Sequence, residues 1–312
     1  MLDFRLRTFL TLCQTKNFSK AGEQLGLTQP AVSQQIHQLE ERYGTKLLTA
    51  VGRNFGLTEA GDLLFRHASF TSAETQRVEE ALAKHAQKIE LRFGATRTIG
   101  EFVMPRALSR YLKTQPDCGL SLVVDNTDAL LQKLTTGQID FAFIEGIFDQ
   151  QDFAAQTLFE DRLELFCAVD DPMAGQVVQI EELLSRRLIV REKGSGSREV
   201  LENALLAQNR SPANFSSVLE IGNIAIIKAL VRDGLGIAFL YGQAASSLPP
   251  TQSLPKENPD LGRILVQGFD IRHAFSFVHR KGSQFLGDFQ GILKEVQAVL
   301  QNEAVLQKEE LP

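Results

Sequence analysis

Residues Phe18–Tyr43 read FSKAGEQLGLTQPAVSQQIHQLEERY, and this stretch decides the fold of the N-terminal part of the chain. In its second half one apolar stripe recurs at the helical spacing i, i+4, i+7 and i+11: Val32, Ile36, Leu39 and Tyr43. The opposite face carries neutral groups where a surface helix normally carries Lys and Glu: Pro30, Ser33, Gln34 and His37. Such a face suits the donors and acceptors that base edges present in the major groove. The pattern predicts a helix-turn-helix, with a generic helical bundle as the alternative.

Residues that begin and end helices support this prediction. We expect Ser19 to cap the first of the two helices and Thr28 the second. Gly26 falls where the chain must turn, and Pro30 falls in the first turn of its helix, where a missing N–H costs nothing. An amphipathic helix precedes them, with these side chains on one face: Leu6, Phe9, Leu10 and Cys13. Three such helices can close a small core.

Two segments closely resemble the LysR-type transcriptional regulators: TQPAVSQQIHQLEERYGTKLL and GRNFGLTEAGDLL. The match is dense and has no gaps. The residues that carry it are Gln29, Ala31, Val32, Ser33, Leu39, Glu40, Gly44, Leu57, Thr58 and Gly61. The resemblance implies that a β wing follows the recognition helix and that the partner is double-stranded promoter DNA. It removes most of the weight from the helical-bundle alternative.

Composition and charge agree with a DNA-binding module attached to a larger body. The chain has 312 residues, 43% of them hydrophobic, which is enough for two or three domains. The net charge is −5, but residues 1–66 carry +2 and the other 246 carry −7. No apolar run approaches the ~18 residues that span a bilayer, and no signal peptide is recognisable. The cysteines, expected to be small buried hydrophobes of a reduced cytoplasm, are Cys13, Cys118 and Cys167.

The chain is expected to divide into three parts and a tail. Residues 1–58 form the winged helix-turn-helix domain, and residues 59–88 a long linker helix that Thr58 caps. Its intermittent apolar positions predict pairing with a second copy, with a solvated spacer as the alternative. Residues 89–302 form the regulatory domain, and residues 303–312 are expected to be frayed.

Strands alternate with helices after Lys88, which predicts βαβ units and a mostly parallel α/β sheet. A break at TLFEDRLELFCAV and a return at RILVQGFDIRHAFSFVHR divide this body into lobe I, about 89–161 and 267–302, and lobe II, about 162–266. A loop spans 246–260, and a last helix is expected from Phe285 to about Asn302. Four segments also look like the LysR family: GATRTIGEFVMP, IDFAFIEG, REKGSGSRE and DGLGIAFL. The resemblance implies a two-lobed effector-binding region similar to periplasmic solute-binding proteins.

The residues predicted to contact DNA lie on the recognition helix and the wing: Thr28, Gln29, Pro30, Ser33, Gln34, His37 and Arg53. Gln can bond adenine through two atoms, and Pro offers a contact to a thymine methyl. The sequence departs from its family at Gln34, at His37 and at Leu48–Ala50, where basic residues are common. Because each lost phosphate contact weakens affinity, several dimeric contacts or a favourable DNA shape are needed.

The residues predicted to bind the effector follow strand ends and open helices: Thr96, Thr98, Asn126, Thr127 and Ser195. Hydroxyls and free N–H groups at several helix N-termini suit a small anion. By resemblance, four of these positions often touch effector in the family: Thr96, Thr98, Thr127 and Ser195. The expected ligand is a small anion such as a sulfur oxyanion or a short carboxylate, and the alternative is that these side chains only cap helices.

Catalysis has little support in the sequence. No His, Cys and Asp cluster has metal-ligand spacing, no cofactor is indicated, and GSGSR lacks the ending of a nucleotide P-loop. A solute-binding protein or an enzyme on the same two-lobed fold is the rival, but it would lack the first 88 residues. An architectural DNA binder would not need the two-lobed body. The sequence therefore predicts a cytoplasmic DNA-binding regulator whose operator binding is modulated by a small effector, and which is not an enzyme. The expected partners are a second copy or three further copies of the chain and RNA polymerase, with no membrane contact.

Overall fold

The computed structural model of the chain describes residues 3–51, 54–83, 90–149, 152–246, 261–283 and 289–308. The chain divides into two compact units, Met1–Gln87 with Thr135–Gln138, and Lys88–Leu134 with Ile139–Pro312. We call them the DNA-binding unit and the regulatory unit. No helix among the residues that the structure describes has the length and apolar character needed to cross a membrane.

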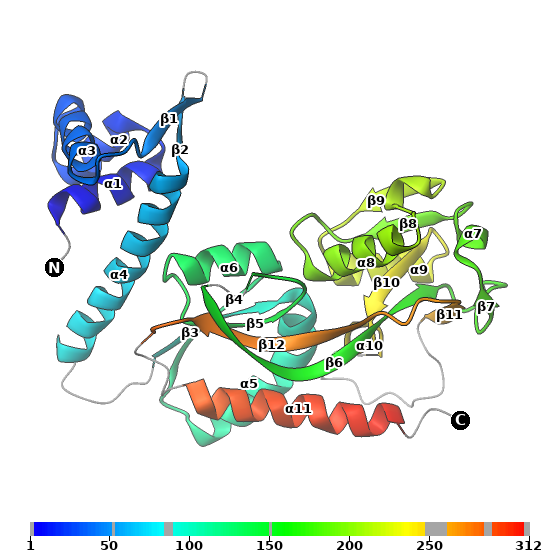
Figure 1. The fold of residues 1–312 in the computed structure, drawn as a ribbon. Coiled ribbons are helices and arrows are strands. Elements are labelled where there is room, and N and C mark those ends of the chain that lie inside the picture. Colours follow the sequence, from blue (N-terminus) through cyan, green and yellow to red (C-terminus); the bar gives the residue numbers. More distant parts are fainter. Residues whose placement is uncertain are drawn as a thin grey trace. The chain divides into compact units, whose positions relative to one another are not determined.

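Three helices and a two-stranded wing form the N-terminal part of the DNA-binding unit (Figure 1). The helices are α1 (Phe4–Thr15), α2 (Phe18–Leu25) and α3 (Gln29–Tyr43), and the wing strands are β1 (Leu48–Val51) and β2 (Asn54–Leu57). The wing strands pair antiparallel. The core consists of side chains from all three helices and the start of the wing: Phe9, Leu12, Ala21, Val32, Ile36, Leu39 and Leu47. The predicted helix-turn-helix is therefore confirmed.

The turn chemistry agrees with the prediction at three of its four positions. Thr28 caps α3 by accepting from the Ala31 N–H, Gly26 has φ of 67° at the end of α2, and Pro30 lies in the first turn of α3. The assignment of Ser19 as the cap of α2 is wrong. Asn17 is the cap, because its extended backbone lets Oδ1 accept from the N–H groups of Ser19 and Lys20.

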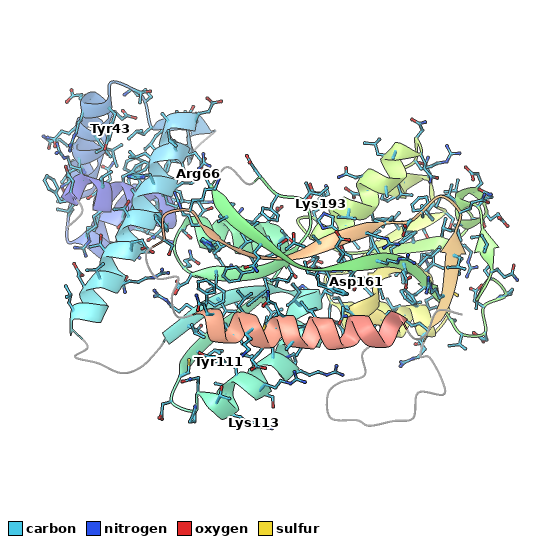
Figure 2. The ribbon with its side chains drawn as sticks, turned by 60° about the horizontal axis from the view of Figure 1, so that its bottom comes forward. Tyr43, Arg66, Tyr111, Lys113, Asp161 and Lys193 are labelled. Atoms are coloured by element: carbon cyan, nitrogen blue, oxygen red, sulfur yellow. The ribbon has the colours of Figure 1, made fainter. Side chains whose placement is uncertain are left out.

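The apolar stripe of α3 ends one turn earlier than predicted. Val32, Ile36 and Leu39 are buried, but Tyr43, labelled in Figure 2, is 46% exposed. The helix reaches its Gly44 cap there and has passed the edge of the small core. The Tyr43 ring lies instead beside the Arg42 guanidinium, 5.9 Å from the ring centroid.

Backbone contacts around Leu47 fix the wing to the helices. The Glu40 carboxylate accepts from the Leu47 N–H at 3.0 Å and from Lys46 Nζ at 2.6 Å. A Cβ on Gly61 would lie 2.0 Å from the Leu47 carbonyl oxygen, so only glycine allows this approach. Thr58 caps the next helix, α4 (Glu59–Ala83), by accepting from the Gly61 N–H. The rest of the expected linker helix, 84–88, lies outside the described residues.

In the regulatory unit, the described strands form a ten-stranded sheet in the order β4-β3-β5-β12-β6-β10-β8-β9, with β11 and β7 attached through β6. Lobe I contains β3 (Glu90–Thr96), β4 (Gly119–Asp125), β5 (Phe141–Glu145) and β12 (Arg272–Arg280). Lobe II contains β7 (Val177–Val178), β8 (Arg187–Val190), β9 (Ser217–Glu220), β10 (Ile237–Tyr241) and β11 (Gly262–Val266). The strand β6 (Phe153–Cys167) belongs to both, since it pairs with β12 and with β10.

The continuity of β6 corrects the predicted break at TLFEDRLELFCAV. The strand runs without interruption from one lobe into the other, because its first half pairs with β12 while its second half pairs with β10 and β11. Interlobe geometry therefore depends on a strand rather than on a loop at this crossing.

Alternate side chains of β5 explain the layers of lobe I. Phe141 and Phe143 belong to the core with α5 (Met104–Thr114) and α11 (Gln290–Lys308), while Ala142 and Ile144 pack with α6 (Thr127–Thr135) on the other face (Figure 1). A π-helical turn, Ile99–Val103, leads into α5. Helices thus cover both faces of the sheet, as a βαβ arrangement requires.

Lobe II repeats this arrangement with shorter elements. The helix α8 (Gly196–Ala207) packs with Leu188 and Val190 of β8, and α9 (Ile224–Arg232) packs with Ile189 on the other face. The remaining helices are α7 (Ile180–Leu183), α10 (Gly242–Ser246) and the 3₁₀ turn Pro212–Asn214.

The C-terminal part differs from the prediction in its last helix. The predicted loop lies outside the described residues except for Ser246, which ends α10. The predicted start of the last helix at Phe285 lies outside the described residues. The helix α11 (Gln290–Lys308) continues past Asn302, so the predicted frayed tail starts too early. The EAVLQK sequence of this predicted tail consists mostly of strong helix formers.

The cysteines were all expected to be buried. Only Cys167 is buried, while Cys13 and Cys118 are half-buried.

Candidate DNA-binding surface and effector site

The outer face of α3 brings most of the predicted DNA-contacting residues together. Thr28 and the first two helical residues, Gln29 and Pro30, are exposed. Gln29 Nε2 donates to Ser33 Oγ at 3.0 Å, one helical turn further on. These two side chains therefore form one hydrogen-bonding edge near the N-terminus of the helix. Arg53 lies outside the described residues.

Two side chains of α3, His37 and Arg42, have an acidic neighbour. His37 Nε2 lies 3.4 Å from Glu41, and Arg42 Nη1 lies 2.8 Å from Asp3. Gln34 is exposed beside them. Hydrogen bonding rather than net positive charge thus characterises the face.

Three of the five predicted effector residues converge on one residue that the sequence did not indicate, Glu145. It ends β5 and is only 1% exposed. The Thr96 and Thr98 hydroxyls donate to the two carboxylate oxygens, and Thr127 donates to the Glu145 carbonyl at 2.8 Å. The protein's own carboxylate thus lies where the predicted anion was expected.

Burial controls the electrostatics of this site. It raises the pKa of Glu145, although the Thr96 hydroxyl, the Arg191 charge and the Thr98 hydroxyl oppose the shift. The Tyr241 hydroxyl nearby is buried and has no hydrogen-bond partner among the described residues. Burial raises the pKa of Tyr241, and the charges of Glu145 and Asp161 raise it further. Burial at this site thus disfavours the charged forms of Glu145 and Tyr241, and the Tyr241 hydroxyl has no partner in the described part of the chain.

Asn126 caps a helix, as the alternative predicts, and this contact leaves its predicted role in effector binding a prediction. Its Oδ1 accepts from the Ala129 N–H at 3.0 Å, at the start of α6. Thr98 precedes the π-helical turn and Ser195 precedes α8, but neither side chain makes a cap hydrogen bond to the described residues. Ser195 Oγ instead lies 3.0 Å from Ser197 Oγ, and both are buried.

Lobe I covers the N-terminus of α8. A Cβ on Gly196 would lie 2.1 Å from the Glu145 carbonyl oxygen and 2.7 Å from the Gly146 Cα. Across the same junction, the Asp128 N–H donates to the Gly194 carbonyl at 3.2 Å. The helix N-terminus predicted to bind an anion therefore packs directly against the other lobe.

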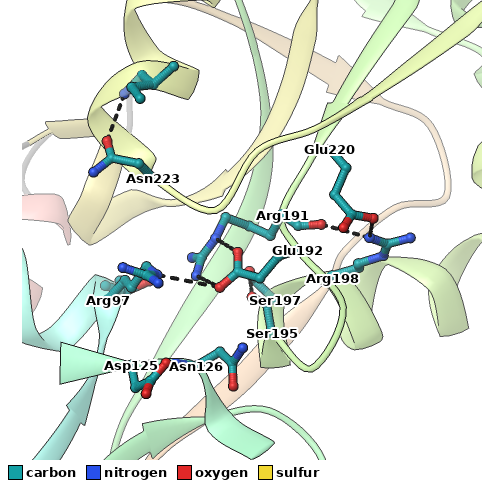
Figure 3. Close-up of polar contacts among 12 residues, drawn as sticks. Arg97, Asp125, Asn126, Arg191, Glu192, Ser195, Ser197, Arg198, Glu220 and Asn223 are labelled. Atoms are coloured by element: carbon teal, nitrogen blue, oxygen red, sulfur yellow. Dashed lines mark hydrogen bonds and ion pairs between the residues drawn. The ribbon is translucent and has the colours of Figure 1, made fainter. Parts of the chain in front are cut away.

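A second cluster missed by the sequence analysis bridges the lobes beside this junction (Figure 3). Arg97 of lobe I donates from Nε to Glu192 of lobe II at 3.4 Å. Arg191 holds the same carboxylate at 2.9 and 3.1 Å. Burial acts to raise the pKa of Glu192, but the Arg191 hydrogen bond and the charges of Arg191 and Arg97 hold it below its ordinary value. The only signal in the sequence was the position of these residues beside predicted strand ends.

Asp161, labelled in Figure 2, gives β6 a buried carboxyl in the middle of its run. It accepts from the Arg162 N–H at 2.7 Å and from the Gln243 N–H, at the start of α10, at 3.0 Å. Burial raises its pKa from the ordinary 3.8 to about 6, although the backbone hydrogen bonds oppose the shift.

We expect Asp161 to make the stability of the regulatory unit fall as the pH rises from about 4 to about 6. In this window the folded chain keeps a proton on Asp161 that the unfolded chain has released. The contribution of this proton to stability is therefore complete below the unfolded pKa of 3.8 and lost above the folded pKa of about 6. Urea unfolding across this window measures the difference in the free energy of unfolding between wild type and Asp161→Asn. This difference is expected to stop changing with pH above about pH 6. The exposed Asp170→Asn is the control, and parallel pH profiles for wild type and Asp161→Asn would contradict the assignment.

Known proteins match both units. The family described as "Bacterial regulatory helix-turn-helix protein, lysR family" matches residues 4–62, and "LysR substrate binding domain" matches residues 84–299. The transcriptional regulator CysL of Bacillus subtilis is 28% identical over 88% of this chain and 89% of its own length.

Two solved structures share the fold. A point variant of full-length OxyR from Pseudomonas aeruginosa aligns with a TM-score of 0.63 and 20% identity, over 95% of each chain. The regulatory domain of CcmR from Synechocystis, solved in complex with 2-PG, aligns with a TM-score of 0.60 and 24% identity, over 69% of this chain and 99% of that domain. The helix-turn-helix match separates this chain from a solute-binding protein that has only the two lobes. The chain belongs to the LysR family of transcriptional regulators, with an N-terminal helix-turn-helix and a C-terminal substrate-binding domain.

Proposed function

We propose that the chain binds promoter DNA through the outer face of α3 and that a small anion held between the two lobes modulates this binding. The observation that carries the effector half is the meeting of buried donors at the lobe junction. Thr96 and Thr98 supply hydroxyls from lobe I, which here donate to Glu145, and Arg191 supplies a guanidinium from lobe II, which here donates to Glu192. Such groups together suit an oxyanion or a carboxylate.

For DNA, we assign base contacts to Gln29 and Ser33, with Pro30 against a thymine methyl. Thr28, Gln34, His37 and Arg53 complete the proposed interface. Since few cations lie on the described part of this face, a single unit makes few phosphate contacts and its affinity falls only gently with salt. Binding by a homodimer or homotetramer compensates, because two recognition helices on one operator add their contacts.

The helix α4 supplies the proposed contact between copies. Three large apolar side chains are exposed on it: Leu63, Val78 and Leu82. We retain the division into residues 1–58, 59–88 and 89–302, with the linker helix as the pairing element. A regulator of this kind acts in the cytoplasm, where its DNA is, is not an enzyme, and can contact RNA polymerase at the promoter.

For the effector, we propose that five residues border the anion: Thr96, Thr98, Asn126, Thr127 and Ser195. Asn126 also caps α6. Burial raises the pKa of Glu145 and so disfavours the charge that would repel an anion. The CcmR regulatory domain, which shares the fold, was solved in complex with 2-PG, and this supports a small-molecule ligand for the regulatory unit. The proposed ligands, sulfur oxyanions and short carboxylates, are all small anions.

We expect Gln29→Ala to lose sequence preference while keeping most non-specific DNA binding. One bidentate base contact discriminates by about 1–3 kcal/mol, so the ratio of specific to random affinity should fall about fivefold to 150-fold. Competitive gel retardation on operator and random DNA measures this ratio. The matched control is Gln115→Ala, an exposed glutamine of the regulatory unit.

Equal weakening on both DNAs would make Gln29 a backbone contact and contradict its assignment. The same retardation assay, titrated with sulfite, sulfate and short carboxylates, tests the effector half. A footprint that changes with one of these anions supports the proposal. A footprint that none of them alters, at millimolar concentration, removes the anionic class.

A further inference from the structure

In the Arg97–Glu192–Arg191 cluster, the two arginines bind the Glu192 carboxylate with hydrogen bonds of different number and length. Arg191 is 5% exposed and grips both oxygens of Glu192, at 2.9 and 3.1 Å. Arg97 makes one longer contact, 3.4 Å, from the other lobe. The contact that links the lobes is therefore the weaker one.

The surroundings keep Arg191 in place while leaving room for the carboxylate. Arg198 Nη1 donates to the Arg191 carbonyl at 2.9 Å. On the far side of the carboxylate, Gly222 lies so close that a Cβ there would be 3.3 Å from Glu192 Oε2. The Glu192 carboxylate therefore lies between the guanidinium groups of Arg97 and Arg191 (Figure 3), and Gly222 lies close to one of its oxygens.

The charges of this cluster require an anion between the arginines. A buried guanidinium without a counter-charge is costly, and planar guanidinium groups bind carboxylate and phosphate through two parallel hydrogen bonds. Glu101 also faces the cluster, but burial raises its pKa and the Glu192 charge raises it further, while Arg97 and Arg191 oppose this. Glu145 is near Arg191 as well, and burial favours its neutral form. Glu192 is the carboxylate that both arginines bind.

We propose that Arg97 and Arg191 form an anion subsite between the lobes and that Glu192 occupies it as an internal ligand until an external carboxylate or phosphate group displaces it. This inference rests on the proposed effector site and adds its charge-bearing residues. Displacement breaks the Arg97–Glu192 contact and replaces it by contacts of both arginines to the ligand. With Glu192 in the subsite, the Arg97–Glu192 contact joins the lobes; with an external anion in it, the anion joins them. An effector that binds one of these two states more tightly shifts the equilibrium toward that state.

The test uses the full chain and inorganic phosphate as the probe, titrated calorimetrically at low ionic strength, where charge contacts are least screened. Glu192→Gln removes the competing charge and keeps the side-chain shape. We expect phosphate to bind this variant about tenfold more tightly than wild type, near the lower end for one charged hydrogen bond. Arg97→Gln in the same background should return the affinity to the wild-type value.

The chain offers a matched control in Glu220, which pairs with Arg198 in lobe II and makes no contact with Arg97 or Arg191 among the described contacts. Glu220→Gln changes the net charge equally and should leave phosphate affinity unchanged. A conservative variant, Glu192→Asp, keeps the charge but shortens its reach toward Arg97, and should give an intermediate gain. It also serves if Glu192→Gln unfolds.

An unchanged phosphate affinity in the folded Glu192 variants, or an equal gain in Glu220→Gln, would overturn the inference and leave the cluster as a structural ion pair. Operator retardation by wild type separates this result from failure of the proposed function. If wild type retards operator DNA in preference to random DNA and Glu192→Gln gains no phosphate affinity, only the role of Glu192 as an internal ligand is contradicted. Loss of that preference in wild type removes the proposed function whatever phosphate does.

Discussion

Replacing Leu39 by alanine is expected to lower the free energy of unfolding of the DNA-binding unit by about 2–5 kcal/mol. The side chain is fully buried on α3, in a core built from only a few residues of each helix. Its removal leaves a cavity that the small unit cannot close, because Phe9 and Val32 are held by their own helices. A change of this size is a large share of the stability of a small domain. Operator binding should therefore be lost together with the fold of this unit.

Urea unfolding of the full chain, followed by operator retardation at each step, measures the effect. The regulatory unit has its own core and should unfold at the wild-type urea concentration. Leu206→Ala makes the same chemical change at a position of α8 that is 68% exposed, and should alter neither transition. Wild-type operator affinity in a less stable Leu39→Ala chain would show that the core and the DNA face are not linked.

Replacing Gly196 by alanine is expected to destabilise the regulatory unit by about 1–3 kcal/mol, the usual cost of overpacking. In a helix this change ordinarily stabilises, since Ala has the higher helix propensity by about 1 kcal/mol. Here the new Cβ would meet the Glu145 carbonyl oxygen at 2.1 Å, and this oxygen already accepts from Thr127. Backbone must move at the junction of the lobes, so the expected sign is the reverse of the propensity effect.

Denaturant unfolding of the regulatory transition gives the sign directly. Asn203→Ala, at an exposed position of the same helix, should be neutral or slightly stabilising. The Gly196→Ala variant should also respond less to the anion that alters the wild-type footprint, because the lobes cannot reach the same contact. Unchanged or increased stability in Gly196→Ala would mean that the lobes part there without cost.

The sequence by itself determined the DNA-binding unit almost completely. Its signals are local: the apolar spacing of α3, the Thr28 cap, and Gly26 at the turn act within one or two helical turns. The errors are also local in origin. Asn17 and Ser19 are both good cap residues, and only the backbone conformation chose between them. Tyr43 continued the apolar period past the edge of the core, where periodicity carries no information about burial.

The regulatory unit shows the opposite balance. Alternation of strands and helices gave the α/β class and the residues at strand ends, because these too are short-range patterns. The tertiary structure alone decided that β6 runs through both lobes, since pairing with β12 and β10 depends on strands distant in the sequence. It likewise decided that Thr96 and Thr98 bind Glu145, and that Arg97 meets Glu192. Residues separated by tens of positions met there through sheet register and lobe packing, which no local pattern encodes.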